Sequence, residues 1–224
     1  ELLADSKSEV SEAYNSVRSS LSLSSGKGLP SSIAFVSTMA SEGKSSACLA
    51  TALSVSKLKK NCVVLDLDLR RPNVHRLLSM SNNVGASNVL AGETSVSAAV
   101  RPTDFPGLSI VTGGPVPPNP AELLTDENIS NLLQELAKSY DVIFVDSAPI
   151  LSLADAIAVN NNCEATVYIV EAGRNSPNAV LCAISRLQES RSKIVGVILS
   201  RFDAGRMGYG YDYAYGYSYE SRDE

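Results

Sequence analysis

The residues best suited to chemistry are Gly43-Lys44-Ser45, in the stretch VSTMASEGKSSACLA, where an apolar run passes into a helical pattern. A helix N-terminus offers unpaired backbone N–H groups and the positive end of the helix dipole, and both favour a phosphate group. In such a loop the glycine lets the backbone approach the ligand, the lysine reaches the β- and γ-phosphates, and the serine hydroxyl can ligate Mg²⁺. The pattern therefore predicts a nucleotide-binding loop. Its expected residues are Ala40, Ser41, Glu42, Gly43, Lys44, Ser45 and Ser46.

Two positions in this loop depart from the usual glycine-rich pattern. Thr38 stands five residues before Gly43, where the first glycine of such loops is normally found, and Ser41 stands where a second glycine is common. Glycine adopts a positive φ at no steric cost, whereas other residues are strained there. A positive φ at Thr38 or Ser41 would therefore lower the affinity of the loop.

Three aspartates follow apolar runs and could complete a nucleotide site. Asp66 and Asp68 close the run VVLDLDLRRP at a spacing that puts both carboxylates on one face, and Asp146 closes VIFVDSAP. Ligands of parallel sheets bind beyond the carboxyl ends of the strands, so we expect these side chains to gather beside the loop. Mg²⁺ on a nucleotide needs one or two carboxylates, which leaves one aspartate to act as a base. In the simplest alternative, Asp66 and Asp68 cap the following turn or pair with Arg70 or Arg71.

The C-terminal stretch YGYDYAYGYSY holds six of the nine tyrosines of the chain. A strand would direct all six rings to one face, but the intervening Gly, Asp, Ala and Ser residues are poor strand formers, and the charged ESRDE follows. A flexible tail is favoured over an edge strand. Such a tail is either adhesive or a substrate. Its tyrosines are Tyr209, Tyr211, Tyr213, Tyr215, Tyr217 and Tyr219.

The elements that must position these residues are visible as alternating patterns. Short runs that are apolar at both odd and even positions predict strands covered on both faces, at 32–37, 62–68, 108–113, 141–146, 165–170 and 194–200. Helical patterns occupy 8–23, 44–58, 127–140 and 177–190, with Asp126 and Ser176 as expected N-caps. Strands that alternate with helices predict an α/β fold with a mainly parallel sheet flanked by helices.

Composition excludes several classes of function. The 224 residues are 44% hydrophobic with a net charge of −5, and the densest basic run, Lys57–Lys60, is typical of a solvated helix end, so we expect no nucleic-acid partner. The single His75 cannot form a metal cluster or a catalytic triad alone. No apolar run approaches a membrane span. Four widely spaced cysteines are expected to be buried free thiols: Cys48, Cys62, Cys163 and Cys182.

Taken together, the segments TMASEGKS, VVLDLDLRRP, TGGPVPPNPAELL and VIFVDSAP and the tyrosine-rich tail resemble the bacterial tyrosine kinase family of capsule and exopolysaccharide synthesis. The resemblance implies a P-loop NTPase fold of the MinD/ParA type, with ATP and Mg²⁺ as cofactors. It implies a non-specific protein-tyrosine kinase that phosphorylates its own tail. In the family pattern Lys44 holds phosphates, Ser45, Asp68 and Asp146 serve the metal, and Asp66 and Asp68 share metal orientation and deprotonation of the incoming tyrosine.

The same resemblance implies partners. The leading helix carries Glu12, Asn15 and Arg18 where the family has an ExxRxxR motif of subunit contacts, so Glu12 and Arg18 are expected in a homo-oligomeric, octameric ring. Family kinases are activated by a membrane-spanning polysaccharide co-polymerase, either a separate chain or an N-terminal part that this sequence, beginning at Glu1, would lack. We therefore expect a cytoplasmic location at the inner face of the plasma membrane.

The expected organisation has three parts: a leading helix and oligomerisation segment (1–30), a P-loop kinase domain (31–203) and a flexible tyrosine-rich tail (204–224). Two alternatives differ in chemistry. A MinD/ParA-like ATPase without kinase activity would commonly end in a basic amphipathic helix, unlike this chain. A nucleotide-gated scaffold would not need an intact set of lysine, serine and aspartates.

Overall fold

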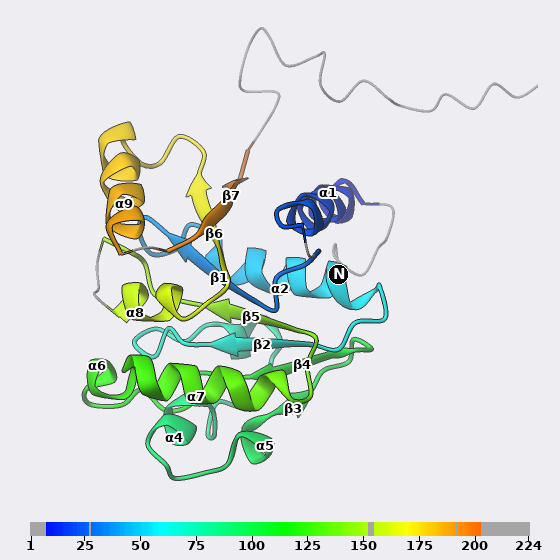
Figure 1. Cartoon of the computed structure of the whole chain (residues 1–224), viewed down its shortest axis with the longest axis vertical. Coiled ribbons are helices and arrows are strands. Elements are labelled where there is room, and N and C mark those ends of the chain that lie inside the picture. The colour runs from blue at the N-terminus through cyan, green and yellow to red at the C-terminus, as the bar shows by residue number, and fades with distance from the viewer. Residues whose placement is uncertain (1–7, 27, 152–154, 191, 203–224) are drawn as a thin grey trace, which may run out of the picture.

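The computed structural model describes residues 8–26, 28–151, 155–190 and 192–202, and it shows helices on both faces of a central sheet (Figure 1). Within these residues the sheet has seven strands in the order β3-β4-β2-β5-β1-β6-β7, and only β3 and β4 pair antiparallel. The predicted α/β fold with a mainly parallel sheet is confirmed. The strands are β1 (Ser32–Ser37), β2 (Cys62–Asp66), β3 (Arg101–Pro102), β4 (Leu108–Val111), β5 (Val142–Asp146), β6 (Ala165–Glu171) and β7 (Ile194–Ser200).

The three strands beside the candidate site are buried along their whole length. β1, β2 and β5 have no exposed residue, as their continuous apolar runs predict for strands that helices cover on both faces. β5 lies between β1 and β2, and its Asp146 pairs in register with Asp66 of β2 on one side and Phe35 of β1 on the other. The loops that follow these strands therefore open at one edge of the sheet.

The observed strands differ from the predicted ones in several places, and β5 begins and β6 ends one residue later than predicted. β2 ends at Asp66, so Asp68 lies in the turn that follows the strand. β4 ends at Val111, before Thr112 and Gly113, which the predicted run included. The two-residue strand β3, which contains a proline, had no strand pattern and was not predicted.

Helices α1 and α2 cover one face of the sheet, and α7, α8 and α9 cover the other (Figure 1). The long helix α7 shows why: its buried residues recur at helical spacing and all face the sheet. The helices are α1 (Glu9–Leu23), α2 (Lys44–Ser56), α3 (Val74–Leu77), α4 (Ala86–Leu90), α5 (Val96–Ala99), α6 (Pro120–Leu123), α7 (Asp126–Ala137), α8 (Asp155–Asn161) and α9 (Pro177–Glu189).

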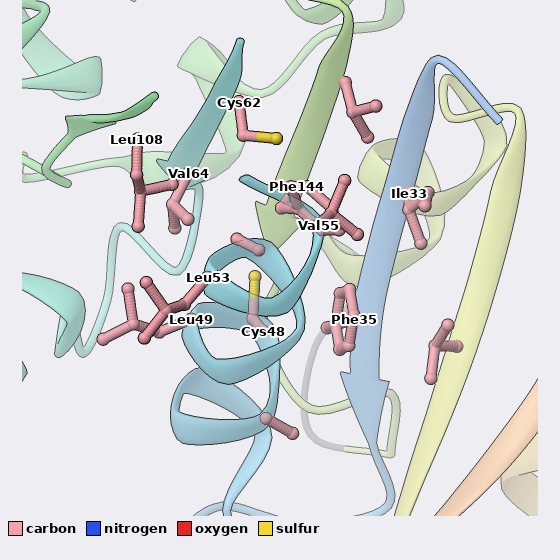
Figure 2. Close-up of a cluster of buried hydrophobic side chains, with 14 of the residues drawn as sticks. Ile33, Phe35, Cys48, Leu49, Leu53, Val55, Cys62, Val64, Leu108 and Phe144 are labelled. Atoms are coloured by element: carbon pink, nitrogen blue, oxygen red, sulfur yellow. The ribbon is translucent and has the colours of Figure 1, made fainter. Parts of the chain in front are cut away.

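The packing of α2 fixes the nucleotide loop relative to the sheet. Its side chains pack between those of β1, β2 and β5 (Figure 2), where the rings of Phe35 and Phe144 lie 6.3 Å apart between centroids. Cys48 and Leu53 of α2 are buried in the same cluster. Burying side chains of this size stabilises a fold by about 1.5–3 kcal/mol each. The first residue of α2, Lys44, is therefore held against the ends of β2 and β5.

Several local predictions can be compared with the structure. The N-cap of α7 is Thr125 and not Asp126, because the threonine hydroxyl accepts the hydrogen bond from the Asn128 N–H. Ser176 is the N-cap of α9, as predicted. Cys48, Cys62 and Cys163 are buried free thiols, but Cys182 is exposed, since it lies on the outer side of α9. In the described part of the chain, no helix combines the length and apolarity that a bilayer crossing requires.

Candidate active site

The ammonium group of Lys44 lies at the centre of the candidate site. Its Nζ is 2.5 Å from Asp146 Oδ1 and 3.9 Å from Asp68 Oδ2. Burial alone lowers the pKa of Lys44, but the Asp146 and Asp68 carboxylates outweigh it, and the pKa is raised. The lysine is thus charged and held by carboxylates. Ser45 donates its hydroxyl to the other oxygen, Asp146 Oδ2, at 2.6 Å.

The turn after β2 is organised by Asp66, which is fully buried. Its Oδ2 accepts the backbone N–H groups of Asn73 (3.0 Å) and Val74 (3.1 Å), and its Oδ1 accepts that of Asp68 (3.2 Å). Burial, together with the nearby Asp146 carboxylate, raises the pKa of Asp66 to about 8. Asp66 therefore caps the following turn, as the simplest alternative proposes, while also lying next to the site.

Asp68 occupies a different environment from Asp66. Its side chain is 10% exposed, and its Oδ1 accepts the Arg71 backbone N–H at 3.1 Å. Burial raises the pKa of Asp68 although Lys44 opposes the shift. The pairing with Arg70 that the simplest alternative allowed is not found, because Arg70 Nε lies 2.7 Å from Asp155 Oδ2 instead. Asp68 is thus the carboxylate of the pair that has a path to solvent.

The segment 112–124 supports the Asp66 turn from the side of β4. A side-chain atom built on Gly113 would lie 2.6 Å from Pro72 Cβ and 3.7 Å from the Asp66 carboxyl carbon. Any larger residue at Gly113 would displace the turn that Asp66 holds. Gly113 is therefore required by packing against the site.

The nucleotide loop has two residues with left-handed backbone conformation. Ser41 has φ 69° and Gly43 has φ 87°, so the second departure from the glycine pattern does fall where a positive φ is needed. Ser41 and Ser46 are exposed, and Ala40 is half-buried. Glu42, in contrast, is fully buried, and its carboxylate accepts the backbone N–H of Met39 at 2.6 Å. The Glu42 side chain is therefore bonded within the protein, so a role of Glu42 in nucleotide binding could involve only its backbone.

Other predicted residues lie elsewhere. Arg18 donates from Nη1 to the carbonyl (2.9 Å) and hydroxyl (3.2 Å) oxygens of Ser54 on α2, and Asn15 accepts from the same hydroxyl at 2.9 Å. Glu12 is exposed on α1. The tyrosines between Tyr209 and Tyr219 lie outside the described residues.

Sequence reasoning missed a group of side chains that contact the outer side of the loop. Arg174 Nη1 donates to the Ser41 carbonyl at 2.9 Å, and Ser200 Oγ donates to the Glu42 carbonyl at 2.6 Å. These residues are more than 130 positions from the loop, and no local pattern in the sequence marks them. Only the neighbouring positions of β1, β6 and β7 in the sheet could have indicated the contact.

The parallel sheet, the glycine-lysine-serine turn and the acidic strand ends define a P-loop NTPase fold. Solved structures agree: the Mg-ADP complex of the septum site-determining protein MinD from Pyrococcus horikoshii aligns with a TM-score of 0.64 over 75% of this chain and 69% of MinD, at 20% identity. At that identity the likeness concerns the fold alone. No family model matches the chain.

More similar proteins identify the family. The Bacillus subtilis tyrosine-protein kinase YwqD is 31% identical over 198 residues, which cover 88% of this chain and 84% of YwqD. The Salmonella typhi tyrosine-protein kinase Wzc is 30% identical over 198 residues, covering 88% of this chain but only 28% of Wzc. The kinase domain of Escherichia coli tyrosine kinase ETK aligns with a TM-score of 0.75 and 28% identity, over 83% of this chain and 73% of that structure. The chain belongs to the bacterial tyrosine-protein kinase family.

Proposed function

We propose that the chain transfers the γ-phosphoryl group of ATP to tyrosine side chains, and that the cluster from Tyr209 to Tyr219 is its own substrate. The observation that carries the proposal is the Lys44 ammonium group, which lies between Asp146 and Asp68 at the first residue of α2. A lysine at this point of a P-loop is a point charge for the β- and γ-phosphates. Membership of a tyrosine-kinase family supplies the acceptor.

The residues present fit a nucleotide with Mg²⁺. The carboxyl groups of Asp66, Asp68 and Asp146 lie around one ammonium group, and burial together with the Asp146 carboxylate raises the pKa values of Asp66 and Asp68, so a bound cation would favour their ionised forms. In the described residues, no three acidic, histidine or cysteine side chains enclose a metal by themselves. That agrees with Mg²⁺ sites on nucleotides, where phosphate oxygens and waters complete the coordination of one or two carboxylates.

Each side chain then has a role in phosphoryl transfer. Lys44 and the backbone N–H groups at the start of α2 would hold the phosphates, while Ser45 and Asp146 would hold Mg²⁺, which neutralises phosphate charge when bound. Asp68, being partly exposed, is the carboxylate that can accept a proton from an incoming phenol, whose pKa is about 10. Asp66 holds the turn that presents Asp68. This assignment divides the two roles that the family pattern leaves shared.

The position of β7 supports the tail as substrate. Ser200, the last residue of β7, donates a hydrogen bond to the nucleotide loop, so the chain that continues toward Tyr209 starts beside the site. The tyrosines follow Ser200 by about 10–20 residues, which reach at most ~30–65 Å when extended. That reach allows transfer within one chain or between neighbours. Each phosphate adds about −1.5 to −2 charges, so modified tails would repel one another.

We infer further that the kinase assembles into a ring through α1, with Glu12 at a subunit contact and Arg18 supporting α1 from within the subunit, and that a membrane-spanning partner brings it to the inner face of the plasma membrane. Glu12 is exposed, as a contact residue must be. Arg18 packs on α2 of its own chain and would act by holding α1 in place. Wzc is more than three times as long as the matching part of this chain, and YwqD is similar in length. This contrast supports a partner that is either fused or separate.

Intact-mass spectrometry after incubation with ATP and Mg²⁺ tests the proposal. We expect the parent chain to gain phosphates on tyrosine, and the Lys44→Met variant, with unchanged circular dichroism, to gain none. Gain of phosphate by Lys44→Met at the parent rate would refute the site assignment. ADP formation without any gain in mass would instead favour a MinD-like ATPase.

A further inference from the structure

The outer side of the nucleotide loop is held by two side chains from the β6–β7 edge of the sheet (Figure 1). Arg174 follows β6 and donates from Nη1 to the Ser41 carbonyl oxygen at 2.9 Å. Ser200 ends β7 and donates from Oγ to the Glu42 carbonyl oxygen at 2.6 Å. Both acceptors are backbone atoms of the loop, so the contacts act on the path of the loop backbone.

The direction of a carbonyl group sets the direction of the N–H group that follows it. In a trans peptide unit the C=O bond and the next N–H bond point in opposite directions. Because the Ser41 and Glu42 carbonyls are drawn toward β6 and β7, the N–H groups of Glu42 and Gly43 are turned the other way, toward the inside of the loop. Those N–H groups stand directly before Lys44, where a phosphate would accept hydrogen bonds.

The loop needs such an external constraint because its backbone is strained. Ser41 has φ 69°, a left-handed conformation that is strained for a residue with a side chain. A strained conformation persists only where its surroundings impose it. The residue that accepts the hydrogen bond from Arg174 is Ser41 itself, the residue that adopts this strained conformation.

The two holding side chains are themselves fixed. Arg174 Nη1 also lies 2.7 Å from Glu171 Oε2, and Glu171 accepts a second ion pair from Arg201 at 2.8 Å. The Ser200 carbonyl accepts the Ala172 backbone N–H at 3.0 Å, which anchors the end of β7 on β6. The donor side chains of Arg174 and Ser200 are therefore held in place by contacts at the ends of β6 and β7.

The buried carboxylate of Glu42 contacts the same segment after β6. Its Oε1 accepts the Glu171 backbone N–H at 3.3 Å and a hydrogen bond from the Asn175 side chain. Its Oε2 closes the loop on Met39. The Glu42 side chain thus fastens the middle of the loop to the segment that carries Arg174.

We propose that Arg174 and Ser200 are positioning residues for phosphate binding, which orient the N–H groups of Glu42 and Gly43 by holding the carbonyl groups that precede them. The inference rests on the proposed function in so far as a nucleotide phosphate occupies the loop. It requires neither that the chain transfer phosphate to tyrosine nor that it assemble into a ring.

Calorimetric titration of the whole chain with ADP and Mg²⁺ tests the role of Ser200. Ser200→Ala removes one neutral hydrogen bond to the loop, and we expect ADP affinity to fall about three- to tenfold. Ser200→Thr retains the hydroxyl and should restore most of the parent affinity. The matched control is Ser190→Ala, which removes a hydroxyl bonded to the Leu187 carbonyl at the end of α9.

Arg174 requires a test that separates its hydrogen bond from its charge. Arg174→Ala should weaken ADP binding more than Arg186→Ala, which removes another exposed arginine that donates to the Leu151 carbonyl. The difference should persist in ~0.5 M salt, where charge effects at the surface are screened. Loss of the difference in salt would show that Arg174 acts only through its charge and would overturn its positioning role.

The outcomes separate this inference from the proposed function. Equal ADP affinity of Ser200→Ala and the parent would overturn the inference alone, as would an equal loss in Ser190→Ala. An affinity loss in Ser200→Ala that Ser200→Thr does not share supports it, even if no tyrosine phosphate forms. A parent chain that binds no ADP would overturn both the nucleotide site and the inference.

Discussion

The raised pKa of Asp66 predicts that this residue destabilises the nucleotide-free protein in a pH-dependent way. Asp66 is fully buried and has a pKa of about 8, against 3.8 for an unperturbed aspartate. The folded chain therefore binds the proton more tightly than the unfolded chain between these values. The free energy of unfolding falls as the pH rises from about 4 to about 8, because the unfolded chain releases the proton first.

The size of the effect follows from the two pKa values. Each pH unit within this window costs a little over 1 kcal/mol, so the Asp66 penalty grows by roughly 3 kcal/mol between pH 5 and pH 7. Asp66→Asn cannot ionise, and its amide oxygen can still accept the N–H groups of Asn73 and Val74. It loses the weaker contact with the Asp68 N–H, worth about 1 kcal/mol. We expect the variant to be more stable than the parent at pH 7.

Denaturant unfolding at pH 5, 6, 7 and 8, without nucleotide and with a metal chelator, measures the effect. The stability difference between Asp66→Asn and the parent should increase in favour of the variant with each step to pH 7, and then level off near pH 8. Asp141→Asn is the control, since Asp141 is an exposed aspartate that also accepts a backbone N–H. A difference that is the same at every pH would refute the claim that Asp66 is held protonated by its surroundings.

Three further changes test other parts of the site. Asp68→Asn should abolish tyrosine phosphorylation in a kinase assay while leaving ADP affinity within about tenfold, because the closer Asp146 carboxylate still holds the Lys44 ammonium group; an equal loss of both would reduce Asp68 to a metal ligand. Ser41→Gly should stabilise the chain by up to about 1 kcal/mol in thermal unfolding, because glycine adopts the positive φ without strain, and a lower melting temperature would contradict this. We expect the parent chain to form smaller assemblies after treatment with ATP, as measured by light scattering. Replacing the six tyrosines between 209 and 219 by phenylalanine should abolish both this decrease and the uptake of phosphate. Phosphate uptake equal to that of the parent would exclude the tail as substrate.

Much of the fold could be predicted because its signals are local. The run SIAFVS gave β1 at its observed bounds, and IVGVILS gave β7 at its bounds, since buried parallel strands are continuous apolar runs. Element ends were less well predicted. Asp126 was expected as the cap of α7, but the adjacent Thr125 is the cap, because both residues are good caps and the sequence cannot show which one adopts the extended backbone.

Parts of the candidate site could be predicted where the residue types of a short motif indicate a particular chemistry. Gly43, Lys44 and Ser45 lie together in sequence, and their order alone indicates a phosphate-binding turn at a helix start. The grouping of Asp66 and Asp146 also followed from the sequence, since parallel strands end at one edge. The different environments of Asp66 and Asp68 could not be predicted. Two aspartates at i and i+2 give the same sequence pattern whether a carboxylate is fully buried in a turn or partly reaches solvent.

The sequence by itself therefore determined the strand and helix pattern, the nucleotide turn and the family resemblance, because these depend on residue order over short spans. Only the tertiary structure decided that Asp66 is fully buried while Asp68 keeps 10% of its side chain exposed, and it alone brought Arg174 and Ser200 to the carbonyl groups of the loop. The physical reason is that burial, and with it each pKa shift and each long-range hydrogen bond, depends on which strands become neighbours. The sheet order places β6 next to β1 and β7 next to β6, and nothing in the residues of the loop indicates that order.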